Sequence, residues 1–366
     1  MMKHRLLFFM YVLFMAMAMA SCRHSPLYDL SNAHYLRIYV CDSIQNINTG
    51  LYDKNAKQKI LHLPQVLRVV LSDKTTGQVV YERYLQHSGR DAHGYYLDGY
   101  IGAPEGNYRL MAYNFGTETT QIRNEYSYFD MTGYTPHISP MYYPLLPQLK
   151  AHDSYDEQNI LYDPDHLWVV ADDDVAISDQ MGIDTLYAAD KSYYRAESIV
   201  ETYYIQVRVR GVQWVRSSVS LLTGMANAKL MHNGKMIGEP PATVYFEMQQ
   251  REKKTVSKPD NSETLAAGKV VEPEEAVMYA TFNTWGKMSD IASLFHITFS
   301  FVKSDGSNQS ETMDITQLFA EEDVRRHRWI LIDKVIEIKK PEGGESGGGF
   351  TPEVEDWDKI DTDVIL

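Results

Sequence analysis

The sequence predicts an all-β protein with two antiparallel β-sandwich domains in tandem. Three observations lead to this fold class. Short segments rich in β-branched and aromatic residues recur along the chain, the connections between them have hairpin length, and few stretches show a helical period. A chain of 366 residues exceeds one ordinary hydrophobic core, which favours two domains. The 26 tyrosines suit strands that are half buried, because a tyrosine has an apolar ring and a polar hydroxyl.

The expected first domain covers residues 34–195 and begins with a clearly alternating strand. In residues 34–41, Leu36, Ile38 and Val40 share one face, and tyrosines and an arginine occupy the other. Further strands are expected at 66–71, 78–85, 94–101 and 108–115. Five prolines make residues 116–195 harder to interpret, although 167–171 has the composition of one more strand. The acidic run 172–174 lacks the spacing of a calcium loop, so a solvated loop is the preferred interpretation over a metal site.

The expected second domain covers residues 196–340 and repeats the same pattern. A long strand at 199–212 alternates apolar with polar side chains, and in the expected strand 293–302 Phe295, Ile297, Phe299 and Phe301 share one face. Other strands are expected at 242–248, 276–285 and 329–338. Residues 314–317 have a capping-box pattern and predict a short helix that reaches Glu322.

The N-terminal residues have the three parts of an export signal. Lys3 and Arg5 precede an apolar run at 6–20, which is shorter than the roughly 20 residues that a membrane-spanning helix needs. Ala20-Ser21-Cys22 is similar to the lipobox of bacterial lipoproteins, in which the cysteine sulfur receives a diacylglyceryl group. We therefore expect residues 1–21 to be a lipoprotein signal peptide, Cys22 to be lipidated, and 22–33 to be a tether. An ordinary secretory signal with a cysteine near its end is the alternative.

Composition narrows the classes of partner. The formal net charge of −14 disfavours nucleic acid and anionic lipid surfaces. The chain has two cysteines, so lipidation of Cys22 would leave Cys41 alone and exclude an internal disulfide.

No catalytic or metal-binding motif is present in the sequence, and we expect neither an enzyme nor a cofactor. Two alternatives stay open: a glycan-binding cell-surface lipoprotein and a secreted hydrolase. Exposed aromatic side chains would indicate the former. Trp168, Trp214 and Trp285 all lie in or beside apolar strand-like runs, so we expect them to pack in the core.

The C-terminal residues combine a flexible linker with a strand pattern. Residues 341–349 are rich in glycine, and a linker of this length reaches at most about 30 Å. In 350–366, apolar or β-branched side chains recur, and four of them are two residues apart. These are Trp357, Ile360, Thr362, Val364 and Leu366. A lone strand is not stable by itself, so this segment is expected to join a sheet, either in this molecule or in a partner.

Several short pieces, in order along the chain, resemble the bacterial fimbrillin superfamily, which includes the stalk, tip and anchor proteins of type V pili. They are Gly106-x-Tyr108-x-Leu110-x-Ala112-Tyr113-Asn114, Ser220-Leu221-Leu222-Thr223-Gly224-Met225, Thr281-Phe282-Asn283-Thr284-Trp285-Gly286 and Asp314-Ile315-Thr316. The resemblance implies transthyretin-like sandwiches and lipoprotein export to the outer membrane.

The same resemblance implies two ways of assembling. Stalk subunits of that superfamily lose their first strand to an arginine-directed protease and accept a neighbour's strand, whereas anchor subunits keep their lipid. Here Arg37 lies within the first expected strand and Arg68 begins the next, which argues against stalk-type processing. The leading hypothesis is a non-enzymatic, lipid-anchored outer-membrane component of a pilus-like assembly that joins other pilus subunits by strand exchange.

Overall fold

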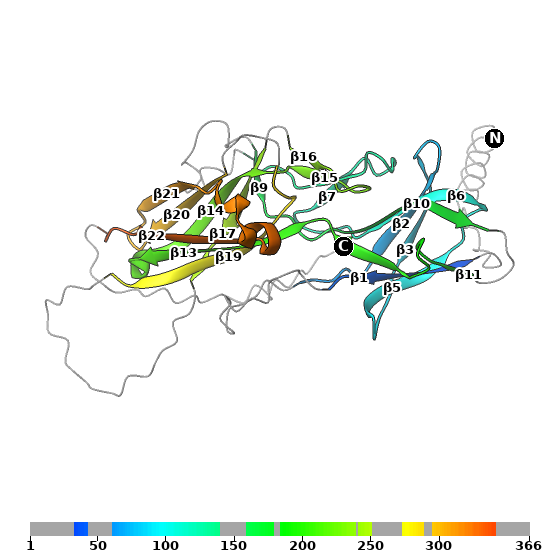
Figure 1. Ribbon diagram of the computed structural model, residues 1–366, viewed down its shortest axis with the longest axis horizontal. Coiled ribbons are helices and arrows are strands. Elements are labelled where there is room, and N and C mark those ends of the chain that lie inside the picture. The colour runs from blue at the N-terminus through cyan, green and yellow to red at the C-terminus, as the bar shows by residue number, and fades with distance from the viewer. Residues whose placement is uncertain are drawn as a thin grey trace, which may run out of the picture.

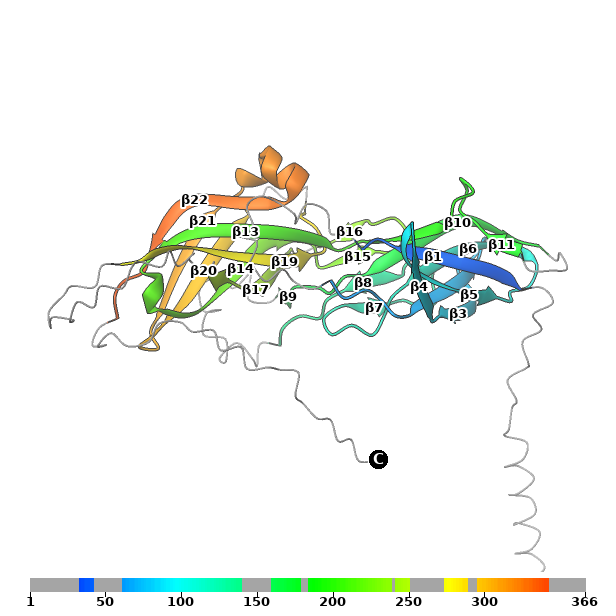
Figure 2. The same ribbon diagram turned by 90° about the horizontal axis from the view of Figure 1, so that it is seen from below.

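The computed structural model describes residues 33–42, 61–139, 159–178, 184–238, 241–250, 273–288 and 295–341. Within them nearly all regular structure is β-strand, which confirms the predicted all-β class. The molecule is elongated, with one group of sheets at each end and a small sheet between them (Figure 1 and Figure 2). None of its described helices is long and apolar enough to cross a membrane.

The first group is one continuous run of strands that folds around a core. The hydrogen-bonded order is β3-β2-β6-β10-β12-β1-β5-β4, with β11 also paired to β1. The bounds are β1 His34–Val40, β2 Leu67–Asp73, β3 Val79–Leu85, β4 His87–Asp91, β5 Gly94–Ile101, β6 Gly106–Tyr113, β10 Trp168–Ile177, β11 Asp184–Leu186 and β12 Tyr194–Ser198. Strand β12 connects the two layers, because its first half pairs with β1 and its last two residues pair with β10.

Strand β1 lies in the interior of this sheet. All seven of its residues pair antiparallel with β5, and its other edge pairs in parallel with β11 and then β12. Leu36, Ile38 and Val40 are buried in the core, as the alternation predicts. The predicted and observed bounds of this strand differ by one residue.

The second group is a sandwich of two sheets. One sheet has the order β18-β19-β13-β22 and the other β21-β20-β14-β17-β9. The bounds are β9 Ile160–Tyr162, β13 Glu201–Arg210, β14 Val215–Met225, β17 Ala242–Glu247, β18 Gln249–Gln250, β19 Glu275–Thr284, β20 His296–Lys303, β21 Asn308–Asp314 and β22 Trp329–Glu337. Phe246 of one sheet stacks on Phe282 of the other, with ring centroids 3.9 Å apart. The phenylalanines predicted to share a face from residue 295 to 301 are all buried in this core.

Strand pairing crosses from one half of the sequence to the other. The small central sheet has the order β16-β15-β8-β7, in which β7 (Gln121–Arg123) and β8 (Thr132–Tyr134) come from the first half. Its other strands, β15 (Ala228–Leu230) and β16 (Met236–Ile237), come from the second half. Strand β9 likewise pairs with β17 of the second sandwich. The division into domains at residue 195 therefore stays a prediction. Strands from before this residue pair with strands from after it.

Trp285 fills the centre of the junction between the sandwiches. Its ring is fully buried, and its indole N–H donates to the Thr135 hydroxyl at 3.1 Å. A Cβ atom at Gly133 would meet this ring at 2.8 Å, so only glycine lets β8 pass so close. Trp168 is buried as expected, and Trp214 packs, partly buried, against the second core.

Two local predictions differ from the structure. The acidic run Asp172 to Asp174 is solvated as expected, with the Asp173 and Asp174 side chains 77 % and 73 % exposed. It is a bulge inside β10 rather than a loop, because the register to β6 shifts there. Its side chains are partnered: Lys74 binds Asp174, and Tyr194 donates to Asp172 at 2.9 Å.

The short helix expected from residue 314 is replaced by the 3₁₀ turn η5 (Leu318–Ala320) and the π-helical turn η6 (Asp323–His327). Strand β21 extends through Asp314, whose carboxylate accepts the Thr316 N–H in a local turn rather than capping an α-helix.

Replacing Trp285 by alanine is expected to lower the free energy of unfolding by about 3–5 kcal/mol, because it opens a large cavity and leaves Thr135 without its donor. Urea unfolding followed by far-ultraviolet circular dichroism measures this. Tyr126→Ala is the matched control: this side chain is 76 % exposed, and its loss should change stability by less than about 0.5 kcal/mol. A loss below 1 kcal/mol for W285A would contradict the central role of this ring.

Candidate functional site

The site residues predicted from sequence lie outside the described parts of the structure. These are the lipidation site Cys22 and the partner-strand residues Trp357, Ile360, Thr362, Val364 and Leu366. The described residues nevertheless show how the chain next to each of these segments is held. The relevant places are β1, the junction between the sandwiches, and the open edge at β22.

Arg37 fixes the outer face of β1. Its guanidinium donates to Asp91 at 3.2 Å and to Asp98 at 3.3 Å, and it lies 3.9 Å from the ring centre of Tyr96. Burial and the hydrogen bond to Asp98 raise the pKa of Tyr35, which also contacts Arg37, to about 12. The peptide bond that follows Arg37 is thus in the middle of a strand paired on both edges. Such a bond is inaccessible to a protease while the sheet is intact.

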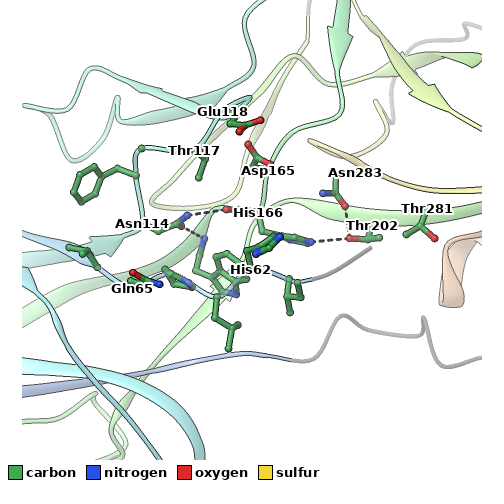
Figure 3. A pocket seen from close by; sticks show the side chains of 17 residues that line it. His62, Gln65, Asn114, Thr117, Glu118, Asp165, His166, Thr202, Thr281 and Asn283 are labelled. Atoms are coloured by element: carbon green, nitrogen blue, oxygen red, sulfur yellow. Dashed lines mark hydrogen bonds between the residues drawn. The ribbon is translucent and has the colours of Figure 1, made fainter. Parts of the chain in front are cut away.

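A pocket of about 550 Å³ lies where the two sandwiches meet (Figure 3). Its walls come from residues 61–66 before β2, the segment 114–118 after β6, the residues that lead into β10, and strands β13 and β19. Both polar atoms of the Asn114 amide bind the chain at the start of β10. The Oδ1 atom accepts the backbone N–H of Trp168 at 2.7 Å, and Nδ2 donates to the His166 carbonyl at 3.1 Å. From the other sandwich, Asn283 donates to the Pro164 carbonyl at 2.8 Å and accepts from Thr202 at 2.8 Å.

The two asparagines and Thr202 are therefore bound within this pocket. Thr119 and Thr120 add hydrogen bonds to the carbonyls of Asp163 and Asp165, at 3.0 Å and 2.7 Å. Backbone groups in a buried connection must find partners, and here side chains of both sandwiches supply them. We define residues 163–168 with Asn114 and Asn283 as the asparagine joint. Its arrangement serves to hold the two sandwiches together and does not resemble a reaction centre.

The sequence contained a signal for this joint that motif reading alone did not interpret. Asn114, Asn283 and Trp285 all belong to the short pieces that carry the fimbrillin resemblance. In the structure each of them contacts the junction. The most recognisable parts of the sequence thus encode the connection between the sandwiches.

A buried ionic network braces the same junction. Glu201, at the start of β13, accepts Lys229 of β15 at 3.4 Å and Arg328 at 3.2 Å. The Lys229 side chain is only 10 % exposed and also donates to the Ile199 carbonyl at 2.9 Å. Although burial acts to raise it, the two cations hold the pKa of Glu201 below its ordinary value, and burial lowers the pKa of Lys229. Sequence reasoning missed this network because its members are far apart in the chain.

The second sandwich has an open side at β22. Among the described strands, β22 pairs with β13 alone and is an edge, and β21 is the corresponding edge of the facing sheet. A groove of about 970 Å³ runs along this side, with Met313, Leu318 and Leu331 among its apolar lining residues. Side chains bridge the two edges, since Lys334 donates to Glu311 at 2.5 Å. The described chain ends four residues beyond β22, at Pro341.

No group of three or more His, Cys, Asp or Glu side chains converges as a metal site within the part of the chain that the structure describes. In the junction pocket, the Asp165 carboxylate accepts the backbone N–H of Thr119 at 2.8 Å.

Comparison with known proteins shows the family to which this chain belongs. The family model described as "Domain of unknown function (DUF5119)" matches residues 62–247, which is half of the chain. The chain belongs to the DUF5119 family. The matched region includes Asn114, residues 163–168 and the Glu201–Lys229 pair, so the DUF5119 model spans most of the junction.

The DUF5119 chain also has relatives among characterised and solved proteins. It is 24 % identical over 310 residues to a candidate fimbrium anchoring subunit, Fim4B, of Bacteroides ovatus, and the match covers 81 % of this chain and 83 % of that protein. A crystal structure of a candidate adhesin from Bacteroides ovatus has the same fold, with a TM-score of 0.51, 20 % identity, and coverage of 88 % of this chain and 99 % of that chain. These matches confirm the fimbrillin-type resemblance that the short motifs indicate.

Replacing Glu201 by glutamine is expected to lower the free energy of unfolding at pH 7 by about 2–3 kcal/mol, since Lys229 and Arg328 lose their counter-charge in a partly exposed site. The Glu201 pKa is lowered on folding, so its contribution is fully present above the ordinary value of 4.5 and is lost as pH falls through the lowered value. Urea unfolding at several pH values should show the difference between E201Q and the wild type shrinking below pH 4.5. Glu322→Gln, an exposed partner of Arg326, is the control and should have almost no effect. A pH-independent loss would mean that the charge of Glu201 is unimportant.

Proposed function

We propose that this chain is a non-enzymatic, membrane-anchoring component of a fimbrium, held in the outer membrane by a lipid on Cys22. The observation that carries the proposal is the position of β1. The residues that follow Cys22 lead into a strand in the interior of the first sheet, paired along both edges. Residues 23–33 limit the distance from lipid to sheet to about 40 Å. A lipid at Cys22 would thus be attached directly to the core of the first sandwich.

Two further observations support an anchoring role over a stalk role. The bond after Arg37 is protected inside β1, so removal of the first strand would require the sheet to open. The relative Fim4B is described as a candidate anchoring subunit, and it matches over most of both chains. Two or three acyl chains, at about 0.8 kcal/mol for each buried CH₂ group, would make the attachment effectively permanent.

We also propose that the chain joins other fimbrial subunits by strand addition through residues 350–366. Their strand pattern needs a sheet edge, and the described chain ends at Pro341, four residues beyond the edge strand β22. The side at β22 has two features that an added strand requires: an edge with no partner strand among the described residues, and apolar side chains beside it. The Gln309 side chain, which donates to the Glu337 carbonyl at 2.7 Å, binds the main chain there. An edge of this kind in a partner subunit would be the corresponding acceptor.

Replacing Cys22 by serine is expected to move the protein from the outer-membrane fraction to the soluble fraction and to abolish incorporation of labelled palmitate. Cys41→Ser is the matched control, because Cys41 is the other cysteine of the chain and lies at the end of β1. That variant should stay in the membrane. Membrane attachment of C22S equal to that of the wild type would refute lipid anchoring.

Mass spectrometry of the wild-type protein from its native membrane separates the anchor from the stalk. An anchor keeps Cys22 as its first residue, whereas stalk-type processing after Arg37 would leave Ile38 first. Recovery of Ile38 as the N-terminus would contradict the proposed anchoring role even if Cys22 is lipidated at an earlier stage.

Deleting residues 350–366 is expected to abolish co-purification of other fimbrial subunits and to leave the free energy of unfolding of the isolated chain unchanged. The reason is that a strand donated to a partner contributes nothing to the fold of its own molecule. Pull-down from the native membrane and urea unfolding measure the two effects. Replacement of Ile360 and Val364 by aspartate tests the same segment at full length. Unchanged assembly together with a lower free energy of unfolding would show that the tail folds back on its own sheet.

A further inference from the structure

The outer face of the first sheet carries a cluster of tyrosines. Because side chains alternate along a strand, the residues that alternate with the core-facing ones in β1 and β5 lie on the outer face, where Tyr39 and Asp98 are covered by their neighbours. We call this surface the tyrosine face and define it by Tyr35, Tyr39, Tyr96, Tyr100, Tyr187 and Tyr193. Strands β1, β5 and β11 lie at the end of the molecule away from β21 and β22 (Figure 1 and Figure 2).

The rings of the tyrosine face are held in a continuous network. Ring centroids are 5.6 Å apart for Tyr35 and Tyr100, 5.7 Å for Tyr39 and Tyr96, and 5.8 Å for Tyr39 and Tyr193. Tyr187 lies 5.2 Å from Tyr193. Such tilted and edge-on contacts fix the orientation of each ring. A ligand therefore binds an ordered surface, and binding costs little additional side-chain entropy.

Charged groups are fixed among these rings. The Asp98 carboxylate is 8 % exposed and accepts hydrogen bonds from Tyr35, Arg37 and, at 2.6 Å, His87. Asp91 accepts from Tyr39 at 2.8 Å as well as from Arg37. Each acid is therefore matched by donors of the protein itself. Arg195 of β12, which lies 5.9 Å from the ring centre of Tyr39, is an exposed cation beside this network.

The composition of the tyrosine face argues against a protein partner and against a polyanion. Its outward positions on β1, β4 and β5 are tyrosine, arginine, aspartate, histidine and two glycines, and none of these described residues has a branched aliphatic side chain. The centre of a protein–protein interface is depleted of charged residues and packs like a protein interior. A nucleic acid or other polyanion would need free cations, whereas Arg37 is already bound by two carboxylates.

We propose that the tyrosine face binds a neutral carbohydrate. A sugar ring has an apolar C–H face, which stacks on an aromatic ring, and a rim of hydroxyls, which need both donors and acceptors. The tyrosine face supplies rings with hydroxyls, carboxylates and a guanidinium between them, and its acids and bases balance. The pairing of Arg37 with Asp91 and Asp98 fits an uncharged ligand, and Arg195 beside Tyr39 is why an anionic probe belongs in the test.

The most exposed rings indicate the size of the ligand. Tyr100 and Tyr187 are 43 % and 45 % exposed and lie on opposite sides of β1. Across the strands, Tyr100 and Tyr187 are two strand spacings apart, a distance of about 10 Å. One sugar ring is too small to reach both, so the site fits an oligosaccharide or a polysaccharide chain that crosses the sheet.

Affinity electrophoresis of the full mature chain in detergent tests this proposal. The native gels would contain yeast mannan, amylopectin, mixed-linkage β-glucan or arabinoxylan as neutral probes, and polygalacturonate as an anionic one. We expect at least one neutral polysaccharide to retard the protein. The double variant Tyr100→Ala/Tyr187→Ala should weaken that binding by about ten-fold or more, equivalent to about 1.4 kcal/mol.

Tyr126→Ala is the matched control, because Tyr126 is the most exposed of the large hydrophobic side chains named here and lies outside the tyrosine face. It should bind like the wild type, and urea unfolding should show that the double variant keeps its fold. No retardation by any neutral probe, retardation by polygalacturonate alone, or equal binding by the double variant would each overturn the proposal. If the double variant instead loses co-purification of fimbrial subunits while no glycan binds, the face is a protein interface and the proposal is wrong.

Discussion

The asparagine joint is the contact on which the shape of the molecule depends. Residues 163–168 pass between two sandwiches, where their backbone groups cannot all pair within a sheet. Asn114 satisfies them from the first sandwich and Asn283 from the second. Asparagine suits this task because one amide carries both donors and an acceptor. With Trp285 buried beside them and the Glu201 network across the junction, the two sandwiches behave as one continuous body.

Local pattern predicts much of this fold because its main strands alternate regularly. The buried faces of β1 and β20 follow from period-two alternation of apolar side chains, and their observed bounds lie close to those expected. Burial of Trp168 and Trp285 likewise follows from their apolar neighbours. These features depend on a few adjacent residues, so a single sequence contains enough information for them.

The parts that pattern missed depend on pairings between distant segments. Strand β9 has three residues between prolines, and its partner β17 is about 80 residues away. In the sequence, Asp172 to Asp174 have the composition of a loop. In the structure they contact Lys74, Arg109 and Tyr194. Nothing next to Lys229 in the sequence indicates an ionic partner, and only the fold brings Glu201 and Arg328 to it. No local period records these contacts.

The position of β1 has a mechanical consequence. A pull on the chain before His34 acts along the strand, against seven residue pairs to β5 and the parallel pairs to β11 and β12. Loaded in this direction, the hydrogen bonds on both edges share the force and must break together, whereas an edge strand pulled sideways opens one bond at a time. Resistance to forced unfolding is a matter of rate, and a strand held in shear raises the barrier that sets it. An attachment made through β1 would therefore last under tension far longer than its equilibrium stability alone implies.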